Sequence, residues 1–182
     1  MPRIPLIQGK DDMPPGHQAL AERIVATFGG VVGPSTVLLH RPELAPPVYD
    51  IGDYFRSRSL VPARLRLLAV LVAARERQGG FVWAAQAEAA RRTGMRDEVI
   101  ELVRSRAAPS RYPPEEAEVV AYAEQLMQTN HVQQDTFDAL RNRHGTQWLI
   151  ELTVVIGYYA MLCGVVNAFE VPPPADGDPL PQ

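Results

Sequence analysis

A stretch of fifteen residues without a charged side chain, residues 152–166, constrains the fold more than any other feature. Glu151 precedes it and Asn167 follows it. A membrane-spanning helix needs about twenty apolar residues, so this stretch is predicted to form a buried helix rather than a span. Because apolar side chains recur nearly all round the helix, we expect it at the centre of the protein.

The rest of the chain also has a helical apolar period. Leu65, Leu68 and Val72 share one face of a segment that begins after Pro62, and no run of useful length alternates as a strand would. The sequence therefore predicts an all-α fold, a helical bundle. Besides a short segment at 35–40, helices are expected near residues 20–28, 44–55, 62–77, 81–93, 97–103, 114–126, 137–144 and 146–169.

The chain length of 182 residues predicts one folded domain. Residues 1–14 are polar and proline-rich and are expected to form an N-terminal arm. Residues 15–171 are expected to form a single helical domain, and residues 172–182 (PPPADGDPLPQ) a proline-rich tail. No basic segment followed by an apolar segment opens the chain, so we expect a cytoplasmic protein without a membrane partner.

Composition argues against several classes of function. A net charge of −3 provides no basic field for a phosphate backbone, so a nucleic-acid partner is not expected. Cys163 is the only cysteine, which excludes a disulfide within the chain and a CxxC redox pair. The four histidines lack the i, i+4 spacing of a helical metal site, and no glycine-rich phosphate loop follows a strand. We expect neither a metal nor a cofactor.

Two segments resemble a known family. Residues 60–75 (LVPARLRLLAVLVAAR) with 81–94 (FVWAAQAEAARRTG) look like the core helical hairpin of carboxymuconolactone decarboxylases and alkyl hydroperoxidase D-like proteins. Residues 149–161 (LIELTVVIGYYAM) and their continuation after Val166 resemble the closing helix of the longer members. The resemblance implies that family's helical fold and a homo-oligomer.

The chain departs from the family where the chemistry takes place. Leu67 and Val82 stand where members commonly carry glutamates, and Gln86 stands where they carry a histidine or, in the peroxidase branch, a cysteine. Trp83 remains as in the family. Aliphatic and amide side chains cannot transfer a proton near neutral pH, and a lone Cys163 cannot provide the thiol pair of a peroxidase.

These departures define the expected site. Gln86, Tyr158 and Tyr159 are the candidate catalytic residues, because an amide or a phenol can polarise a substrate carbonyl through a hydrogen bond. The candidate substrate-binding residues are Leu67, Val82 and Trp83, which should converge with Gln86 on one pocket. An aromatic residue at helical spacing is more often part of the core, so Trp83 is expected to have a structural role while it also lines the pocket. Gln86 could fill a vacated site without a catalytic role.

Three functions stay open on this basis. The first is a small-molecule enzyme, a lyase, isomerase or cyclase, that tailors a hydrophobic metabolite in an apolar pocket and relies on positioning more than on a titrating group. The second is a non-catalytic ligand-binding or structural homo-oligomer. The third is a conventional decarboxylase that uses other residues. A thiol peroxidase is not expected.

Overall fold

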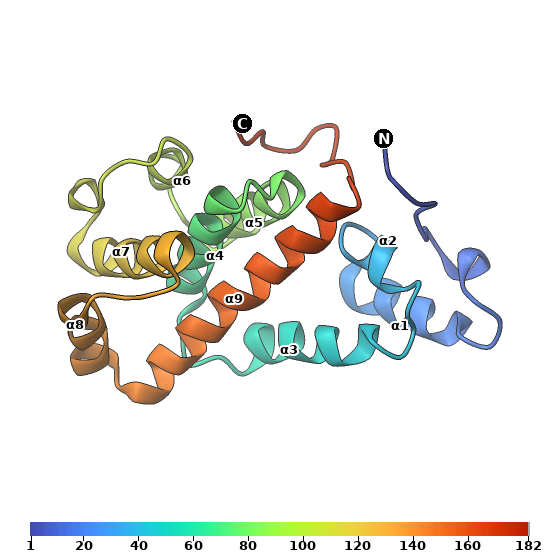
Figure 1. Ribbon diagram of the computed structural model, residues 1–182, viewed down its shortest axis with the longest axis horizontal. Coiled ribbons are helices and arrows are strands. Elements are labelled where there is room, and N and C mark those ends of the chain that lie inside the picture. Colours follow the sequence, from blue (N-terminus) through green and yellow to red (C-terminus); the bar gives the residue numbers. More distant parts are fainter. Residues whose placement is uncertain (182) are drawn as a thin grey trace.

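The computed structural model describes residues 1–181, and no strand occurs in that range. Nine α-helices are joined by short loops (Figure 1), so the all-α prediction is confirmed. The helices are α1 (Gln18–Phe28), α2 (Ser35–Leu38), α3 (Ala45–Ser57), α4 (Ala63–Glu76), α5 (Gly80–Arg92), α6 (Asp97–Arg104), α7 (Pro114–Thr129), α8 (Gln134–His144) and α9 (Thr146–Ala168).

Helix α4 forms the centre of the core. Every residue from 67 to 74 is buried, because α5, α7 and α9 pack around the helix. Pro62 precedes its first turn, where a missing amide hydrogen costs no helical bond. Three alanines, at positions 69, 73 and 74, stand among the leucines and valines of this stretch, and their small size allows three helices to approach α4 closely.

Helix α9 was expected to be central because it is apolar nearly all round, but only part of its surface is buried. The helix crosses the front of the molecule in Figure 1, and it packs against α3, α4, α5 and α8. Within residues 1–181 it alone is long and apolar enough to cross a membrane, yet only 39% of its most apolar window is buried. Apolar composition all round a helix shows that the helix can be buried, but the arrangement of the neighbouring helices decides which of its faces are covered.

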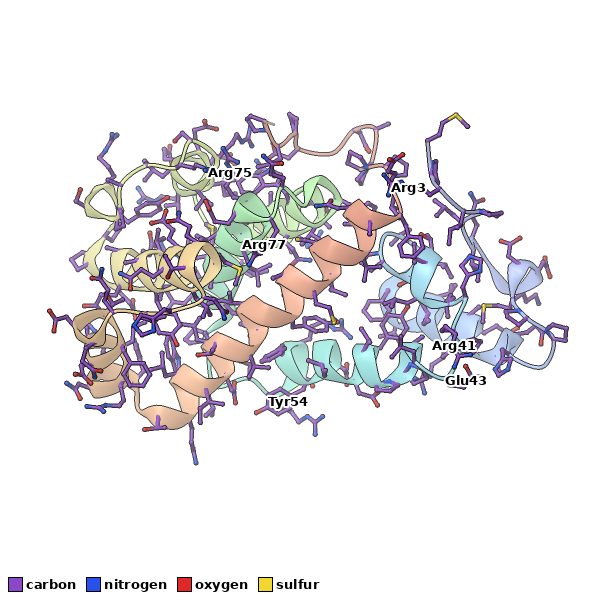
Figure 2. The ribbon with its side chains drawn as sticks, in the orientation of Figure 1. Arg3, Arg41, Glu43, Tyr54, Arg75 and Arg77 are labelled. Carbon is purple, nitrogen blue, oxygen red and sulfur yellow. The ribbon has the colours of Figure 1, made fainter. Side chains whose placement is uncertain are left out.

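Both chain ends pack against the helices. The amide of Ile7 donates to the carbonyl of Thr36 at 3.0 Å, and the Ile7 side chain is buried. Arg3 lies beside the end of α9 (Figure 2), where Nη1 donates to the carbonyl of Ala168 at 3.1 Å. At the other end, Asp178 pairs with Arg91 of α5 and with Arg104 of α6. The proline-rich tail therefore lies on the helical domain through residue 181.

Candidate functional site

A cavity of about 510 Å³ lies between α3, α4, α5 and α9. Its apolar walls come from each of these helices, with Phe55 from α3, Leu67 from α4, Ala85 from α5 and Leu162 from α9. The volume suits a small organic ligand, since ligand pockets range from about 300 to 1,000 Å³. The cavity also contains Gln86, Tyr158 and Tyr159, the three residues that the sequence proposed for catalysis.

Two glycines allow the walls to approach each other. The hydroxyl of Tyr158 lies against Gly52 of α3, where a Cβ atom would stand 2.6 Å from the hydroxyl oxygen. Gly33 has a φ of +56° and faces the ring of Phe81, which leaves no room for a side chain. The glycine at each place sets the separation between the N-terminal segments and the helical core, and thus the shape of the cavity.

Aromatic side chains form the end of the cavity next to α3. The rings of Tyr158 and Tyr159 meet edge to face with centroids 5.2 Å apart, and the ring of Phe55 lies 6.3 Å from that of Tyr158. Burial raises the pKa of Tyr158 and of Tyr159 above the usual tyrosine value. Both phenols therefore stay protonated at neutral pH, when they can donate a hydrogen bond to a ligand.

Tyr49 contributes a third phenol, from α3. Its hydroxyl has no hydrogen-bond partner of acceptable geometry within the described chain, although burial keeps it from solvent. Burial raises the pKa of Tyr49, and Ser35 nearby lowers it in part. A buried polar atom without a partner costs free energy that a ligand can recover.

Three arginines line the same cavity, namely Arg56, Arg66 and Arg92. Arg56 pairs with Asp53 at 3.2 Å and stacks over the ring of Phe28, and Arg92 pairs with Glu88 one turn before it. These two cations are therefore partly neutralised within their own helices, where such exposed pairs contribute little to stability.

Arg66 differs from the other two arginines. It is half-buried, and it forms no ion pair among residues 1–181. Its Nη1 donates to the carbonyl of Val61 at 3.0 Å, which fixes the guanidinium in place. Burial lowers the pKa of Arg66, and Tyr159 and Glu151 oppose that effect. A guanidinium stays charged in proteins, so Arg66 adds to the cavity a partly desolvated cation that forms no ion pair within residues 1–181.

The lining contains none of the side chains that transfer protons near neutral pH. Among the described residues, no aspartate, glutamate, histidine or cysteine contributes to it. Hydrogen-bond donors and positive charge predominate instead, through the three arginines, three tyrosines and Gln86. The cavity can bind an anion and polarise a carbonyl, but it provides no ordinary general base.

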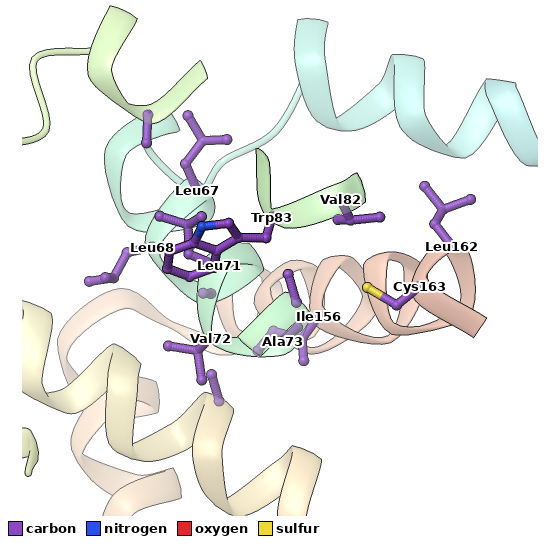
Figure 3. Packing of buried hydrophobic residues seen from close by; sticks show 14 of the residues in the cluster. Leu67, Leu68, Leu71, Val72, Ala73, Val82, Trp83, Ile156, Leu162 and Cys163 are labelled. Atoms are coloured by element: carbon purple, nitrogen blue, oxygen red, sulfur yellow. The ribbon is translucent and has the colours of Figure 1, made fainter. Parts of the chain in front are cut away.

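Two of the residues proposed for substrate binding lie outside the lining. Trp83 is fully buried in the core, in the same hydrophobic cluster as Leu67 and Leu68 (Figure 3), about 200° around α5 from Ala85. The indole Nε1 has no hydrogen-bond partner, and the Arg104 guanidinium lies 5.6 Å from the ring. Val82 is buried on the side of α5 toward α9. The face of α5 that lines the cavity begins at Phe81 and continues through positions 85, 89 and 92. It therefore includes neither Trp83 nor Val82.

Sequence reasoning gave no site role to Tyr49, Arg56 or Arg92. A signal existed for α3, because Tyr49, Gly52 and Arg56 have the i, i+3, i+7 spacing of one helical face. That spacing shows that the three residues share one face of α3, but it does not show which segment of the chain packs against this face. The packing of α3 against α9 joins segments far apart in the sequence, and no motif in the chain predicts it.

Cys163 lies outside the cavity. Its side chain is fully buried against Gly79, and burial raises the pKa of the thiol to about 12. Such a thiol is almost entirely protonated at neutral pH and is a poor nucleophile. No group of three or more histidine, cysteine, aspartate or glutamate side chains within residues 1–181 is arranged to hold a metal ion.

Comparison with known proteins supports the fold. No protein-family model and no curated protein sequence matches the chain. A solved structure described as an alkylhydroperoxidase AhpD core, an uncharacterised peroxidase-related protein from Ralstonia eutropha, superposes with a TM-score of 0.80 at 16% identity, over 96% of this chain and 93% of that one. A protein of unknown function from Agrobacterium tumefaciens, described as a candidate antioxidant defence protein AhpD, gives a TM-score of 0.69 at 20% identity, over 77% of this chain and 97% of that one. The fold is thus the alkyl hydroperoxidase D-like fold.

Proposed function

Starting from this fold, we propose that the chain is a small-molecule enzyme of the lyase or isomerase type, acting on an organic acid with an apolar body. One observation carries the proposal, namely that Arg66, which forms no ion pair among residues 1–181, lines a cavity to which the described residues contribute three arginines and no acidic side chain. A ligand carboxylate would give this cation its missing counterion, through charge-assisted hydrogen bonds. The hydrophobic ligand expected from the sequence is thereby extended to one that also has an anionic group.

The lining suits a reaction that depends on positioning. Leu67, Phe55 and Leu162 would enclose the apolar body, and Gln86 would donate its amide hydrogen to a ligand carbonyl. Tyr158 and Tyr159, protonated at neutral pH, would add hydrogen bonds to the same carbonyl as negative charge develops on it. A cyclisation or isomerisation gains most from such binding, because holding the reactant in a reactive conformer supplies much of the acceleration.

A non-catalytic ligand-binding protein is the second candidate. The same absence of proton-transferring side chains favours it, since the cavity would then need only to hold its ligand. A conventional decarboxylase would need another proton donor, and Cys163 does not reach the cavity. The expected cytoplasmic location and the absence of nucleic-acid, membrane and cofactor partners stay predictions.

A binding experiment with matched ligands tests the ligand class. Cinnamate and 2-naphthoate are titrated by calorimetry, alongside the corresponding neutral amides. We expect the acids to bind and the amides to bind at least tenfold more weakly. Arg66→Gln should remove this preference, whereas Arg96→Gln, at an exposed position away from the cavity, should keep it. Equal binding of acids and amides would contradict the proposal.

A second measurement separates an enzyme from a binding protein. Bound acids are incubated with the protein and followed by mass spectrometry and by NMR, which detects an isomer of unchanged mass. Conversion that Gln86→Ala slows while the fold is preserved supports the enzyme. Binding without conversion of any acid that occupies the cavity supports the non-catalytic alternative.

A further inference from the structure

Phe81, near the start of α5, borders two separate spaces. It lines the cavity of about 510 Å³ that contains Gln86, and it also lines a hollow of about 490 Å³ beneath the C-terminal tail. Among the residues that the structure describes, no other residue lines both. Phe81 therefore stands where the proposed ligand cavity and the hollow beneath the tail come closest to each other.

The ring of Phe81 closes the cavity against the segment before α2. It lies directly on Gly33, where a Cβ atom would find no room. Val32 and Pro34, on either side of Gly33, line the cavity at the same place. Phe81 is half-buried and packs against the hydrophobic core. The ring is thus a wall of the cavity at the point where α5 meets residues 32–34.

The hollow on the other side of Phe81 is covered by the C-terminal tail. The tail turns back from the end of α9 over α5 (Figure 1), and a Cβ atom at Gly177 would stand 2.9 Å from the Cβ atom of Ala84. The carboxylate of Asp178 accepts a hydrogen bond of 2.6 Å from Arg91 and another from Arg104. These contacts hold the tail in place as the outer wall of the hollow.

The lining of the hollow suits an apolar group. Gln78, Asn167 and Asp178 contribute the polar side chains of its described lining, and the rest is glycine, alanine, proline and larger apolar residues. The Asn167 amide donates to the carbonyl of Arg77 at 2.9 Å, and Asp178 is paired with arginine. Because these two polar groups already have partners, the hollow offers more to a hydrocarbon chain than to a charged group.

Arg66 and Phe81 lie at opposite ends of a helical hairpin. Helices α4 and α5 pack against each other and are joined by residues 77–79 alone, so they run antiparallel. Arg66 lies in the first turn of α4, and the following residues 67–76 span about 15 Å. Phe81 lies next to the connection, in the first turn of α5. An acid whose carboxylate binds Arg66 would therefore extend its apolar body toward Phe81.

We propose that Phe81 is a specificity-determining residue, which sets the length of the apolar body that the cavity accepts. Its ring stops the ligand chain at residues 32–34, and the chain enters the hollow beneath the tail only where the ring is removed. The inference rests on the proposed function, because it takes the carboxylate at Arg66 as the fixed end of the ligand. Each buried methylene raises the affinity about fourfold, and the first methylene beyond the ring loses that gain.

A homologous series of straight-chain acids tests the length limit. Alkanoates from hexanoate to tetradecanoate are titrated against the full chain by calorimetry, each below its micelle concentration. For the wild type, the affinity should rise with each methylene and stop rising at one homologue. In Phe81→Ala the rise should continue, so that the acid two carbons beyond the wild-type limit binds at least tenfold more tightly than it binds the wild type.

Two further variants separate the effect of the ring from a general loosening of the core. Leu67→Ala also enlarges the cavity, but Leu67 does not border the hollow, so the limit should stay at the same homologue. Adding Asp178→Ala to Phe81→Ala frees the tail from Arg91 and Arg104 and should weaken the longest acids alone. Circular dichroism checks that each variant is folded, and Phe81→Leu replaces Phe81→Ala if the smaller side chain prevents folding.

The corresponding neutral amides distinguish this inference from the proposed function. Acids that bind no better than amides overturn the ligand class, whereas a limit that Phe81→Ala moves in both series still supports the role of Phe81. An unchanged limit in a folded Phe81→Ala protein overturns the inference, even where the acids keep their preference. An affinity that rises through tetradecanoate in the wild type also overturns it. Failure of both series to bind the wild type overturns both proposals.

Discussion

The hydroxyl of Tyr54 donates a hydrogen bond of 2.5 Å to Oε1 of Glu151 and so joins α3 to α9. Ser59 and the amide of Leu60 donate to the other carboxylate oxygen at 2.8 and 2.7 Å. Burial alone would raise the pKa of Glu151, but the hydrogen bonds outweigh it and lower the pKa below the usual glutamate value. One carboxylate thus holds the start of α9, the end of α3 and the loop before α4.

This relationship predicts a pH-dependent stability. A lowered folded-state pKa stabilises the protein above the unfolded value of about 4.3, and this stabilisation is lost as the pH falls through the folded pKa. Glu151→Gln should therefore cost about 1–3 kcal/mol at pH 7 and progressively less below pH 4. Urea unfolding at pH 7, 5, 4 and 3 measures the difference. For Glu43→Gln, at an exposed position, the difference in unfolding free energy from the wild type should not shrink as the pH falls. A difference that stays constant for Glu151→Gln would contradict the prediction.

Gly52 and Tyr158 should be coupled in stability. Replacing glycine by alanine inside a helix normally stabilises it by about 0.5–1 kcal/mol. Gly52→Ala should show no such gain in the wild type, because its Cβ would meet the Tyr158 hydroxyl. In a Tyr158→Phe background the obstructing oxygen is gone and the gain should appear. Thermal unfolding of the four proteins measures the coupling, and additive effects would show that the contact imposes no constraint.

Gln86→Ala should weaken binding of a ligand that has a carbonyl group within reach of the amide. Loss of one buried hydrogen bond costs about 1–3 kcal/mol, or roughly 5- to 150-fold in affinity or turnover. Calorimetry with a keto acid and its deoxygenated analogue separates this contact from the carboxylate contact. If Gln86→Ala weakens both ligands equally, or neither, Gln86 makes no specific contact with the carbonyl.

Restoring the glutamate and the histidine that related proteins carry at positions 82 and 86 should not produce catalytic turnover. Val82 is 3% exposed and lies in the core behind the cavity, so Val82→Glu buries a charge without a partner. We expect the double variant Val82→Glu, Gln86→His to lose several kcal/mol of stability and to gain no turnover. Gln86→His alone is the control, because Gln86 is only half-buried. Faster turnover in a folded double variant would show that the replaced side chains still fit this site.

Cys163 should be inert. With its pKa raised to about 12, the thiol should resist a disulfide reagent at pH 8 in the folded protein and react only after unfolding. Cys163→Ala should leave any activity unchanged and cost about 1–2 kcal/mol, because a small cavity replaces the sulfur next to Gly79. Loss of activity in a folded Cys163→Ala protein would assign the thiol a role that its position does not suggest.

The sequence by itself determined where the helices form and which catalytic side chains the protein lacks. Periodic apolar positions and prolines such as Pro62 act within a few residues, so α4 and its neighbours could be predicted locally. The replacements at Leu67, Val82 and Gln86, and the single cysteine, already excluded the usual acid–base set and a thiol pair. All of this information is present in residue types and short spacings.

Only the tertiary structure decided which faces meet. It brings Arg66 of α4 to the same cavity as Tyr158 of α9 and Arg56 of α3, and it turns Trp83 away from it. It also leaves one side of α9 exposed, although the composition of this helix is apolar all round. The physical reason is that a helical period specifies a face, whereas the neighbour of that face depends on packing between segments far apart in the chain.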